Sequence, residues 1–317
     1  MIPGDKMKNI KVIFMGTPTF AVPILNKLIE ETNVILVVSQ PDREKDKKGN
    51  ILPTPIKKVA LENNIEVFQP INIKESYKEI ILKEPDIIIT CAYGQIIPEA
   101  ILTYPKYGCI NVHGSLLPKL RGGAPIHHAI INGEEKTGIT IMYMDKKMDS
   151  GDIISQEAIE IKENDNLDLV YEKMSQLGAN LLIKTLPEII NGTNKRIKQN
   201  ELEVTFGYNI TKEEEKIDFN KNAQEIHNRI RGLSSMPGAY CLFEDKRLKI
   251  YTSEITEKKS NDIPGKIVKI DKTGMYINTK DYIIKILDIK LEGKKRCLIK
   301  DFVNGIKQED YVGKVLK

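Results

Sequence analysis

Apolar residues follow two different spacings in the first two hundred positions of the chain. Short apolar runs of strand length alternate with longer stretches whose apolar residues recur every three or four positions, as on one face of a helix. The predicted strands are residues 10–15, 34–39, 66–68, 86–91 and 109–112. The predicted helices are residues 18–31, 55–63, 74–83 and 165–190. This alternation predicts an α/β fold with a mostly parallel, Rossmann-like sheet and helices on both of its faces.

Two further strands break the alternation. Residues 137–144 and 153–161 have the composition of strands, and no helix is predicted between them. Strands that follow each other without a crossover helix pair in opposite directions. The sheet is therefore expected to have an antiparallel edge.

After residue 190 the pattern changes to a polar connector and then to short β-rich runs. Residues 212–220 and 223–231 are predicted as short helices. The runs that follow them, separated by Gly and Asp turns, are 240–243, 248–252, 265–270, 275–279, 282–289 and 294–299. Short strands of this kind are typical of a small barrel. We therefore expect a Rossmann-like domain over residues 1–190, a linker over 191–210 and a barrel domain over 211–317.

The turn after the first strand lacks the common phosphate-binding fingerprints. Gly16-Thr17-Pro18 stands where a dinucleotide-binding fold would carry G-x-G-x-x-G, and Pro18 and Phe20 occupy positions where close approach to a pyrophosphate needs glycine. The Walker A pattern is also missing. These absences disfavour a nicotinamide dehydrogenase and leave the polar residues at strand ends as the candidates for chemistry.

Composition and the absence of long apolar runs argue against several other classes of protein. The chain is 41% hydrophobic and 29% charged, which is ordinary for a globular protein. No apolar run approaches the roughly 20 residues of a membrane helix, and the N-terminus has no apolar core of a signal peptide. We therefore expect a cytoplasmic protein without a membrane partner. A start at Met7, with residues 1–6 as an extension, is compatible with the sequence.

The four cysteines are far apart, with no Cys-x-x-Cys and no histidine at ligand spacing; they are Cys91, Cys109, Cys241 and Cys297. This spacing favours buried thiols in a reducing compartment over a disulfide or a zinc site. No metal is expected.

Charge is distributed unevenly along the chain. Residues 1–200 carry 25 basic and 25 acidic side chains, whereas residues 216–317 carry 22 basic and 14 acidic ones. Inside the neutral half, residues 41–58 form a loop with six basic and three acidic side chains. Basic segments of this kind indicate a polyanionic partner, although a charged loop can also simply face solvent.

Three polar residues follow the predicted strands. Asn111 and His113 lie two apart on an extended segment, so their side chains point to the same side, and a turn-rich loop over residues 148–152 can bring Asp149 near the imidazole. An amide, an imidazole and a carboxylate together support attack by a neutral amine on an acyl carbon. In that chemistry Asn111 stabilises the oxyanion, and His113 takes the amine proton or, when protonated, also stabilises the oxyanion. Asp149 sets the tautomer and charge of the imidazole. The alternative is that Asn111 and Asp149 form turns and His113 is a core histidine.

Longer motifs around these residues carry a family resemblance. They are Met15-Gly16-Thr17-Pro18, Gln40-Pro41-Asp42-Arg43, Ala92-Tyr93-Gly94-Gln95-Ile96-Ile97-Pro98, Asn111-Val112-His113-Gly114-Ser115-Leu116-Leu117-Pro118 and Asp149-Ser150-Gly151. By these motifs the chain, from about residue 7 to its end, resembles the 10-formyltetrahydrofolate-dependent formyltransferase family. The resemblance is greatest to the members that act on methionyl-tRNA.

The resemblance implies roles for individual residues. Those matching the catalytic residues of the family are Asn111, His113 and Asp149. Those matching its tetrahydrofolate contacts, in two loops, are Ser115, Leu116, Leu117 and Pro118, and Tyr93, Gly94 and Ile96. Those matching its tRNA-binding loop are Arg43, Lys45, Lys47 and Lys48. The resemblance also implies an OB-like C-terminal barrel that binds tRNA.

The expected activity is transfer of the formyl group of 10-formyltetrahydrofolate, a co-substrate, to the α-amino group of methionine on initiator Met-tRNA. We expect the enzyme to act as a monomer. Two alternatives remain open on the sequence. One is a formyltransferase of the same fold that acts on a small amine, such as a sugar nucleotide or a purine precursor. The other is a tRNA-binding protein without enzymatic activity.

Overall fold

The chain folds into two compact units in the computed structural model, which describes residues 7–317. The first unit runs to Pro125 and includes Thr137–Ile159 and Tyr171–Tyr208. The second consists of Ile126–Lys136, Glu160–Val170 and Asn209–Lys317. The expected extension at residues 1–6 lies outside the described residues. The predicted linker therefore belongs, for most of its length, to the first unit.

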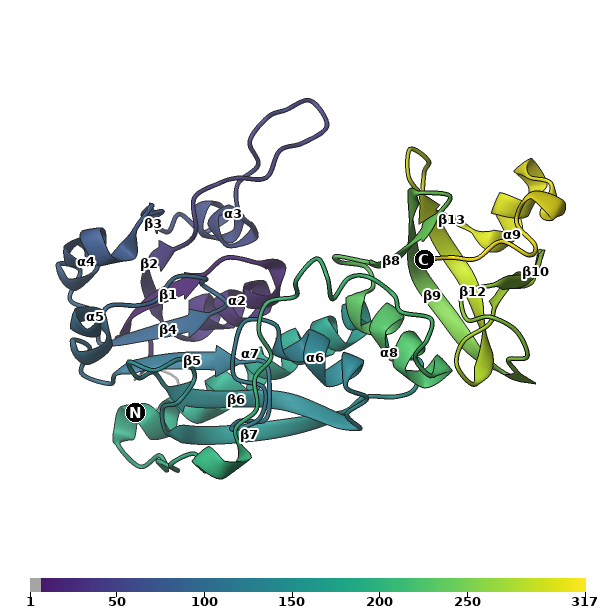
Figure 1. The fold of residues 1–317 in the computed structure, drawn as a ribbon. Coiled ribbons are helices and arrows are strands. Elements are labelled where there is room, and N and C mark those ends of the chain that lie inside the picture. The colour runs from purple at the N-terminus through teal and green to yellow at the C-terminus, as the bar shows by residue number, and fades with distance from the viewer. Residues whose placement is uncertain (1–6) are drawn as a thin grey trace. The chain divides into compact units, whose positions relative to one another are not determined.

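A seven-stranded sheet with the order β3-β2-β1-β4-β5-β6-β7 forms the centre of the N-terminal fold (Figure 1). Its strands are β1 Lys11–Gly16, β2 Asn33–Val38, β3 Val67–Phe68, β4 Ile87–Cys91, β5 Cys109–His113, β6 Lys136–Tyr143 and β7 Ile153–Glu160. The strands from β3 to β5 are parallel, and β6 pairs antiparallel to β5. The predicted Rossmann-like sheet and its antiparallel edge are confirmed.

Helices cover both faces of this sheet. They are α2 Val22–Glu31, α3 Pro55–Glu62, α4 Ile73–Ile81, α5 Glu99–Thr103 and α7 Leu167–Asn191. The helix α6, Pro125–Ile131, belongs after its first residue to the second unit. The predicted helix 18–31 starts later than expected, because residues 19–21 form a short 3-10 turn before α2. Two helices, α5 and α6, were not predicted, since five and seven residues are too few to show a helical period.

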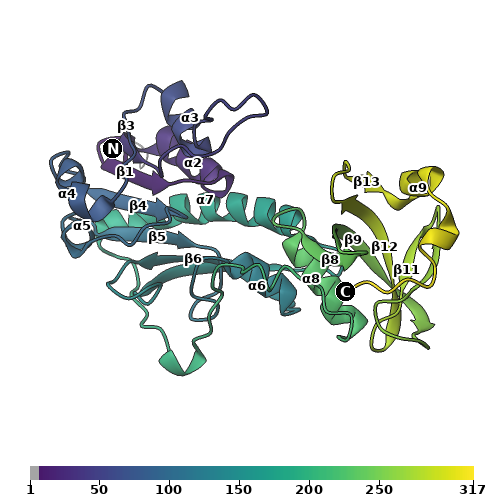
Figure 2. The same ribbon diagram turned by 45° about the horizontal axis from the view of Figure 1, so that its top comes forward.

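Alternation along each strand assigns residues to the two faces. Ile13 and Met15 of β1 pack in one cluster with Ile80 of α4 and Ile101 of α5. On the other face α7 approaches β5 closely at Gly178, where a Cβ would lie 3.1 Å from a methyl of Val112. The long helix α7 can be followed in Figure 2. Both faces are thus buried, as a parallel sheet requires.

The second unit contains an antiparallel sheet with the order β10-β11-β12-β9-β8, and β13 pairs with β12. Its strands are β8 Ala239–Phe243, β9 Lys246–Lys259, β10 Ile267–Asp271, β11 Gly274–Ile277, β12 Tyr282–Leu291 and β13 Cys297–Leu298. Besides α6, its helices are α8 Ala223–Leu233 and α9 Ile299–Phe302. The predicted strands are confirmed, although β9 extends well beyond 248–252 and the 294–299 region contains only the two-residue strand β13.

The predicted helix at residues 212–220 is wrong. Thr211 and Glu214 exchange hydrogen bonds between side chain and backbone, as at a helix start, but the turn does not continue. Instead Lys216 bridges Tyr240 of β8, and the Ile217 amide donates to the Tyr240 carbonyl at 2.8 Å. Pairing with β8 therefore overrides the local helical preference of this Glu-rich segment.

The C-terminal segment joins the two ends of the antiparallel sheet. The Ile267 amide of β10 donates to the Lys314 carbonyl at 2.9 Å, and the Lys317 amide donates to the Leu242 carbonyl of β8 at 3.0 Å. Between these contacts the Leu316 side chain is 3% exposed and lies in the core of the unit. The segment therefore covers both edge strands and closes the sheet on itself.

We expect Leu316→Ala to destabilise the C-terminal unit by about 2–5 kcal/mol, because it leaves a cavity in a closed core. Urea unfolding of the full chain, followed by hydrogen exchange in β8 and β10, measures the effect. Val315→Ala is the matched control, since this neighbouring side chain is 40% exposed. Equal urea midpoints for the two variants would contradict a closing role for Leu316.

Candidate active site

His113 ends strand β5 and is almost completely buried, with 6% of its surface exposed. Its Nε2 lies 3.1 Å from the carbonyl oxygen of Leu120. Because a carbonyl can only accept, Nε2 carries the hydrogen and donates it. In the neutral ring Nδ1 is therefore the nitrogen with a lone pair, and it is the atom that can take up a proton.

Asp149 lies in the loop between β6 and β7, in the left-handed region with φ at 51°. Its Oδ2 is 3.8 Å from Nδ1 of His113 and accepts a hydrogen bond of 2.8 Å from the Gly122 amide. A separation of 3.8 Å is too long for a direct hydrogen bond, so the two groups face each other without one. The Leu120 carbonyl sets the tautomer of His113, and the Asp149 carboxylate faces Nδ1.

Asn111 lies two residues before His113 on the same strand. Its Oδ1 accepts a hydrogen bond of 3.0 Å from Oγ1 of Thr90, which lies opposite Asn111 on the neighbouring strand β4. Since the oxygen end of the amide is engaged, Nδ2 is the end that can donate to a substrate oxygen. The sequence did not indicate this supporting role of Thr90.

Residues 199–207, which follow α7, are hydrogen-bonded to the loop after His113 and to the loop that carries Asp149. The Arg121 amide donates to the Thr205 carbonyl at 2.9 Å, and the Gly207 amide donates to the Arg121 carbonyl at 2.8 Å. The Gln199 side chain donates to the carbonyls of Asp149 and Gly151 at 2.8 and 2.9 Å. This part of the predicted linker is therefore a structural part of the site, and its polar sequence contains no local signal for that role.

Glycine is required where the two segments meet. Gly122 has φ at 122°, and a Cβ on it would lie 2.7 Å from the Gly207 carbonyl oxygen. A side chain there would push apart the paired segments and move the amide that binds Asp149.

We expect Gly122→Ala to lower kcat by about 10- to 100-fold in a formyl-transfer assay, because a small displacement of catalytic groups is costly. Gly123→Ala is the matched control: Gly123 is exposed and is not among the residues with positive φ. Retention of full kcat in Gly122→Ala would show that the contact does not position Asp149.

Hydrogen bonds to neighbouring segments hold the first predicted folate loop, residues 115–118, in place. Oγ of Ser115 donates to the Lys119 carbonyl at 2.7 Å, and Oγ1 of Thr140 donates to the Ser115 carbonyl at 2.6 Å. The Leu117 carbonyl accepts from Gln156 at 2.8 Å, and its side chain is buried. Leu116 and Pro118 are only partly buried, so the surface that this loop can offer to a ligand is apolar.

The second predicted folate loop pairs a buried residue with an exposed one. The Tyr93 carbonyl accepts from Thr17 at 3.1 Å and from Gln40 at 3.2 Å. Its ring is 3% exposed, burial raises the pKa of its phenol to about 12, and Oη has no hydrogen-bond partner among the described residues. Gly94 has φ at 90°, and Ile96 is 73% exposed. Ile96, rather than the Tyr93 ring, is the apolar surface available here.

The basic loop between β2 and α3 is a small hairpin. The Leu52 amide donates to the Glu44 carbonyl at 2.8 Å, Lys45 bridges Ile51, and the Asp46 carboxylate accepts the amides of Lys48 and Asn50 at its tip. The predicted tRNA-binding side chains are all exposed: Arg43, Lys45, Lys47 and Lys48. No ion pair within residues 7–317 involves any of these four.

Lys57, in the first turn of α3, is only partly exposed, unlike the four basic residues of the hairpin. Its ammonium group forms an ion pair with Asp42 and donates to Oε1 of Gln69 at 2.8 Å, while Gln69 donates to Oδ1 of Asp42 at 2.8 Å. Asp42 also accepts the Thr54 amide at 3.1 Å, so it ties both ends of the hairpin together. Lys57 therefore anchors the basic loop and is not one of its free charges.

Asp42 makes this anchor sensitive to acid. Partial burial opposes its ionisation, but hydrogen bonds from Lys57, Gln69 and the Thr54 amide outweigh it, so the pKa of Asp42 is lowered from its ordinary 3.8. A carboxyl group with a depressed pKa in the folded state stabilises that state above its unfolded pKa, and this contribution is lost as the pH falls through the folded value.

We expect Asp42→Asn to reduce the free energy of unfolding by about 1–3 kcal/mol at pH 7, because partners of the carboxylate are left unsatisfied. The difference from wild type should stay constant from pH 8 to pH 5 and shrink only below about pH 4. Urea unfolding at several pH values measures it, with Glu44→Gln, at an exposed acidic residue of the same hairpin, as the control. A difference that disappears between pH 7 and pH 5 would contradict the anchor.

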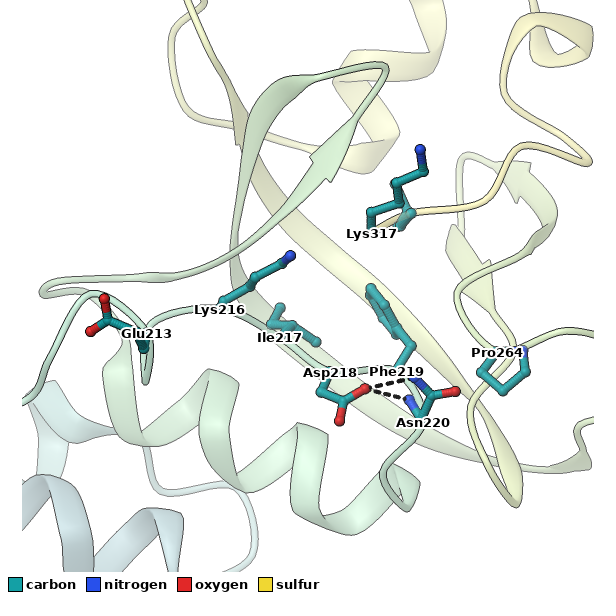
Figure 3. Close-up of a pocket in the computed structure, with 9 residues that line it drawn as sticks. Glu213, Lys216, Ile217, Asp218, Phe219, Asn220, Pro264 and Lys317 are labelled. Carbon is teal, nitrogen blue, oxygen red and sulfur yellow. Dashed lines mark hydrogen bonds between the residues drawn. The ribbon is translucent and has the colours of Figure 1, made fainter.

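The second unit has a pocket of about 390 Å³ in its basic region (Figure 3). It is lined by Glu213, Lys216, Ile217, Asp218, Phe219, Asn220, Pro264, Leu316 and Lys317. Figure 3 shows the side chains of Lys216 and Lys317 extending beside the Phe219 ring, while Asp218 is engaged with Asn220. The pocket thus combines two lysines with two acidic residues, around a phenylalanine that is 4% exposed.

Three of the four cysteines are buried and all are free, as expected; Cys297 is partly exposed. Burial raises the pKa of Cys91 and Cys109 far above the ordinary thiol value and that of Cys241 to about 12. Within residues 7–317 no group of three or more potential ligands is placed to hold a metal ion. In the same residues no helix is both long enough and apolar enough to cross a membrane.

The Rossmann-like sheet carries an amide and an imidazole on β5, and the loop after β6 brings a carboxylate to the imidazole. Comparison with known families specifies the class. Residues 8–186 match the model of the formyl transferase family, and residues 209–307 match the model of the formyl transferase C-terminal domain. The chain belongs to the formyl transferase family.

Known proteins resemble the chain over nearly its whole length. The methionyl-tRNA formyltransferase of Staphylococcus epidermidis is 50% identical, and that of Staphylococcus aureus is 48% identical. Each alignment covers 96% of this chain and 99% of the relative. Among solved structures, an N-formyltransferase from Helicobacter canadensis, in complex with folinic acid and dTDP-3-aminofucose, matches with a TM-score of 0.65 at 24% identity. It covers 87% of this chain and 98% of that one.

Proposed function

We propose that the chain transfers the formyl group of 10-formyltetrahydrofolate to the α-amino group of methionine on initiator Met-tRNA, which gives N-formylmethionyl-tRNA for translation initiation. The observation that carries this proposal is the 48–50% identity, over 96% of the chain, to relatives named methionyl-tRNA formyltransferase. The geometry around His113 supports it, since a donor amide, a proton acceptor and a carboxylate surround one reaction centre.

Each catalytic group has one task in this reaction. The neutral amine attacks the formyl carbon, and Nδ2 of Asn111 donates to the oxygen on which negative charge develops. Nδ1 of His113 takes the proton that the amine loses when the new C–N bond forms, and Asp149 stabilises the resulting imidazolium. The bond from the formyl carbon to N10 of tetrahydrofolate then breaks, and the proton passes to N10. Nothing in this sequence requires a covalent link to the protein.

The two predicted folate loops suit a flat heterocycle. Leu116, Pro118 and Ile96 offer apolar surface, and the backbone around Ser115, Leu117, Tyr93 and Gly94 is held by internal hydrogen bonds. Apolar surface beside fixed backbone polar groups is typical of small-molecule sites. The co-substrate supplies an activated formyl carbon when bound there.

The tRNA would bind through positive charge on both units. The exposure of Arg43, Lys45, Lys47 and Lys48 on the hairpin supports contacts with phosphates, and so does the exposure of Lys216 and Lys317 beside the pocket of the OB-like second unit. Contacts of this kind give affinity that falls with salt and carry little sequence information. A monomer in the cytoplasm, where charged tRNA and folate are available, is part of the same proposal.

A formyltransferase for a small amine is the second candidate. The Helicobacter canadensis protein binds an amino-sugar nucleotide, but its 24% identity to this chain supports a shared fold rather than a shared substrate. A single assay separates the candidates, using labelled formyl donor with initiator Met-tRNA, elongator Met-tRNA, or an amino-sugar nucleotide without tRNA. Turnover only with initiator Met-tRNA is expected. Turnover of the amino sugar alone, or none at all, would refute the proposed function.

We expect His113→Ala and Asp149→Ala each to lower kcat by about 100- to 10,000-fold, since a group that moves or stabilises the proton is lost. Asp149→Asn keeps the size of the side chain and removes its charge, so it separates charge from packing. Single-turnover rates with saturating Met-tRNA measure the effect. Near-normal turnover in either alanine variant would exclude the assigned roles.

A further inference from the structure

Residues 205–208 are paired with residues 120–124, which we call the catalytic loop, and they also carry an exposed aromatic pair. Phe206 is 47% exposed and Tyr208 is 58% exposed. Their ring centroids lie 5.1 Å apart with an interplanar angle of 5°, so the two rings are stacked on each other. The other stacked pair in residues 7–317, Phe243 with Tyr311, involves a buried phenylalanine. An exposed apolar pair of this kind marks an interaction site more often than isolated surface aromatics do.

The pair lies close to the reaction centre. Phe206 bridges Arg121, whose neighbour Leu120 accepts the hydrogen bond from His113. Paired segments lie about 4.8 Å apart and consecutive Cα atoms 3.8 Å, which places the Cα of Phe206 within roughly 9 Å of that of Leu120.

The pair is also held firmly. Oγ1 of Thr205 accepts the Leu120 amide at 2.9 Å, and the Gly207 carbonyl accepts the Ala124 amide at 2.9 Å. Each aromatic residue is therefore next to a residue that is hydrogen-bonded to the catalytic loop. Since Phe206 and Tyr208 are two positions apart on an extended segment, both side chains project to the same side, in agreement with their stacking.

We propose that Phe206 and Tyr208 form a stacking platform for an unpaired base at the 3′ end of the aminoacylated substrate. This inference rests on the proposed function, because it requires a polynucleotide substrate. In an aminoacyl ester only the ester group and one ribose separate the reactive amine from the terminal base. A base stacked on this platform would therefore hold the amine near Nδ1 of His113.

A flat base suits the site better than the other parts of the two substrates. Every base has a π-face, and stacking on exposed aromatic side chains is how proteins hold single-stranded nucleic acid without reading its sequence. The methionine side chain is flexible and favours an enclosed pocket, which an exposed ring pair does not provide. The pterin ring has its own candidate loops at residues 93–98 and 115–118.

The test compares Phe206→Ala, Phe206→Leu and Tyr208→Ala with wild type, with initiator Met-tRNA as the varied substrate. We expect KM for Met-tRNA to rise by about 5- to 100-fold, which corresponds to the loss of one stacked base. The KM for 10-formyltetrahydrofolate should not change, and Phe206→Trp should retain the wild-type KM. Tyr104→Ala is the matched control, because Tyr104 is 42% exposed in the first unit but lies outside this segment.

A second substrate series identifies what the platform binds. Met-tRNAs that lack one base at a time in the unpaired 3′ end, with the backbone intact, should react more slowly with wild type. For one of them the effect of Phe206→Ala should disappear. An effect of Phe206→Ala that persists with every abasic substrate would overturn base stacking, and a raised KM for the folate would assign the platform to the co-substrate instead.

The outcomes also separate this inference from the proposed function. If wild type formylates Met-tRNA but the KM values of the Phe206 and Tyr208 variants stay within twofold, the platform is refuted and the function stands. If wild type does not formylate Met-tRNA, the proposed function fails and the platform fails with it.

Discussion

The hydrogen bond from Nε2 of His113 to the Leu120 carbonyl is the contact on which the candidate site depends. It fixes the proton on Nε2, and so leaves Nδ1 as the atom that faces Asp149 at 3.8 Å. A different position of the Leu120 carbonyl would permit the other tautomer, in which Nδ1 could not accept a proton. The conformation of the loop that starts at Leu120 is therefore as important to the chemistry as the identity of His113.

That loop is held by chain that comes much later in the sequence. Thr205 and Gly207 pair with it, and buried Arg121 binds Gln199 and Glu201. The ion pair of Arg121 with exposed Glu201 contributes little by itself, because solvent screens it. A guanidinium buried without these partners would nevertheless be costly. The segment after α7 is thus ordered by its hydrogen bonds to the loop that starts at Leu120. In this it differs from a flexible linker between domains.

The sequence predicted the parts of the fold whose signals are local. Buried parallel strands appear as apolar runs, and a period of two placed Asn111 and His113 on one face of β5. Pairing between distant segments has no such signal, so the contact of Thr205 with Leu120, 85 residues apart, could not be predicted. The same limit explains the wrong helix at residues 212–220, because that segment pairs with strand β8 of the second unit. It also explains why the role of Lys57 was not predicted, since its acidic partner lies 15 residues earlier.

On the proposed function, affinity and alignment make different demands on the tRNA substrate, and different residues would meet them. Exposed lysines such as Lys47 and Lys48 would attract phosphates over a distance but fix no geometry, because their side chains are long and mobile. Transfer between two bound substrates depends on alignment to within about an ångström. Segments whose backbone is held by hydrogen bonds can provide that alignment. On the proposed function, residues 93–98 and 115–118 would position the folate and residues 205–208 the aminoacylated end, while the basic surfaces contribute to binding.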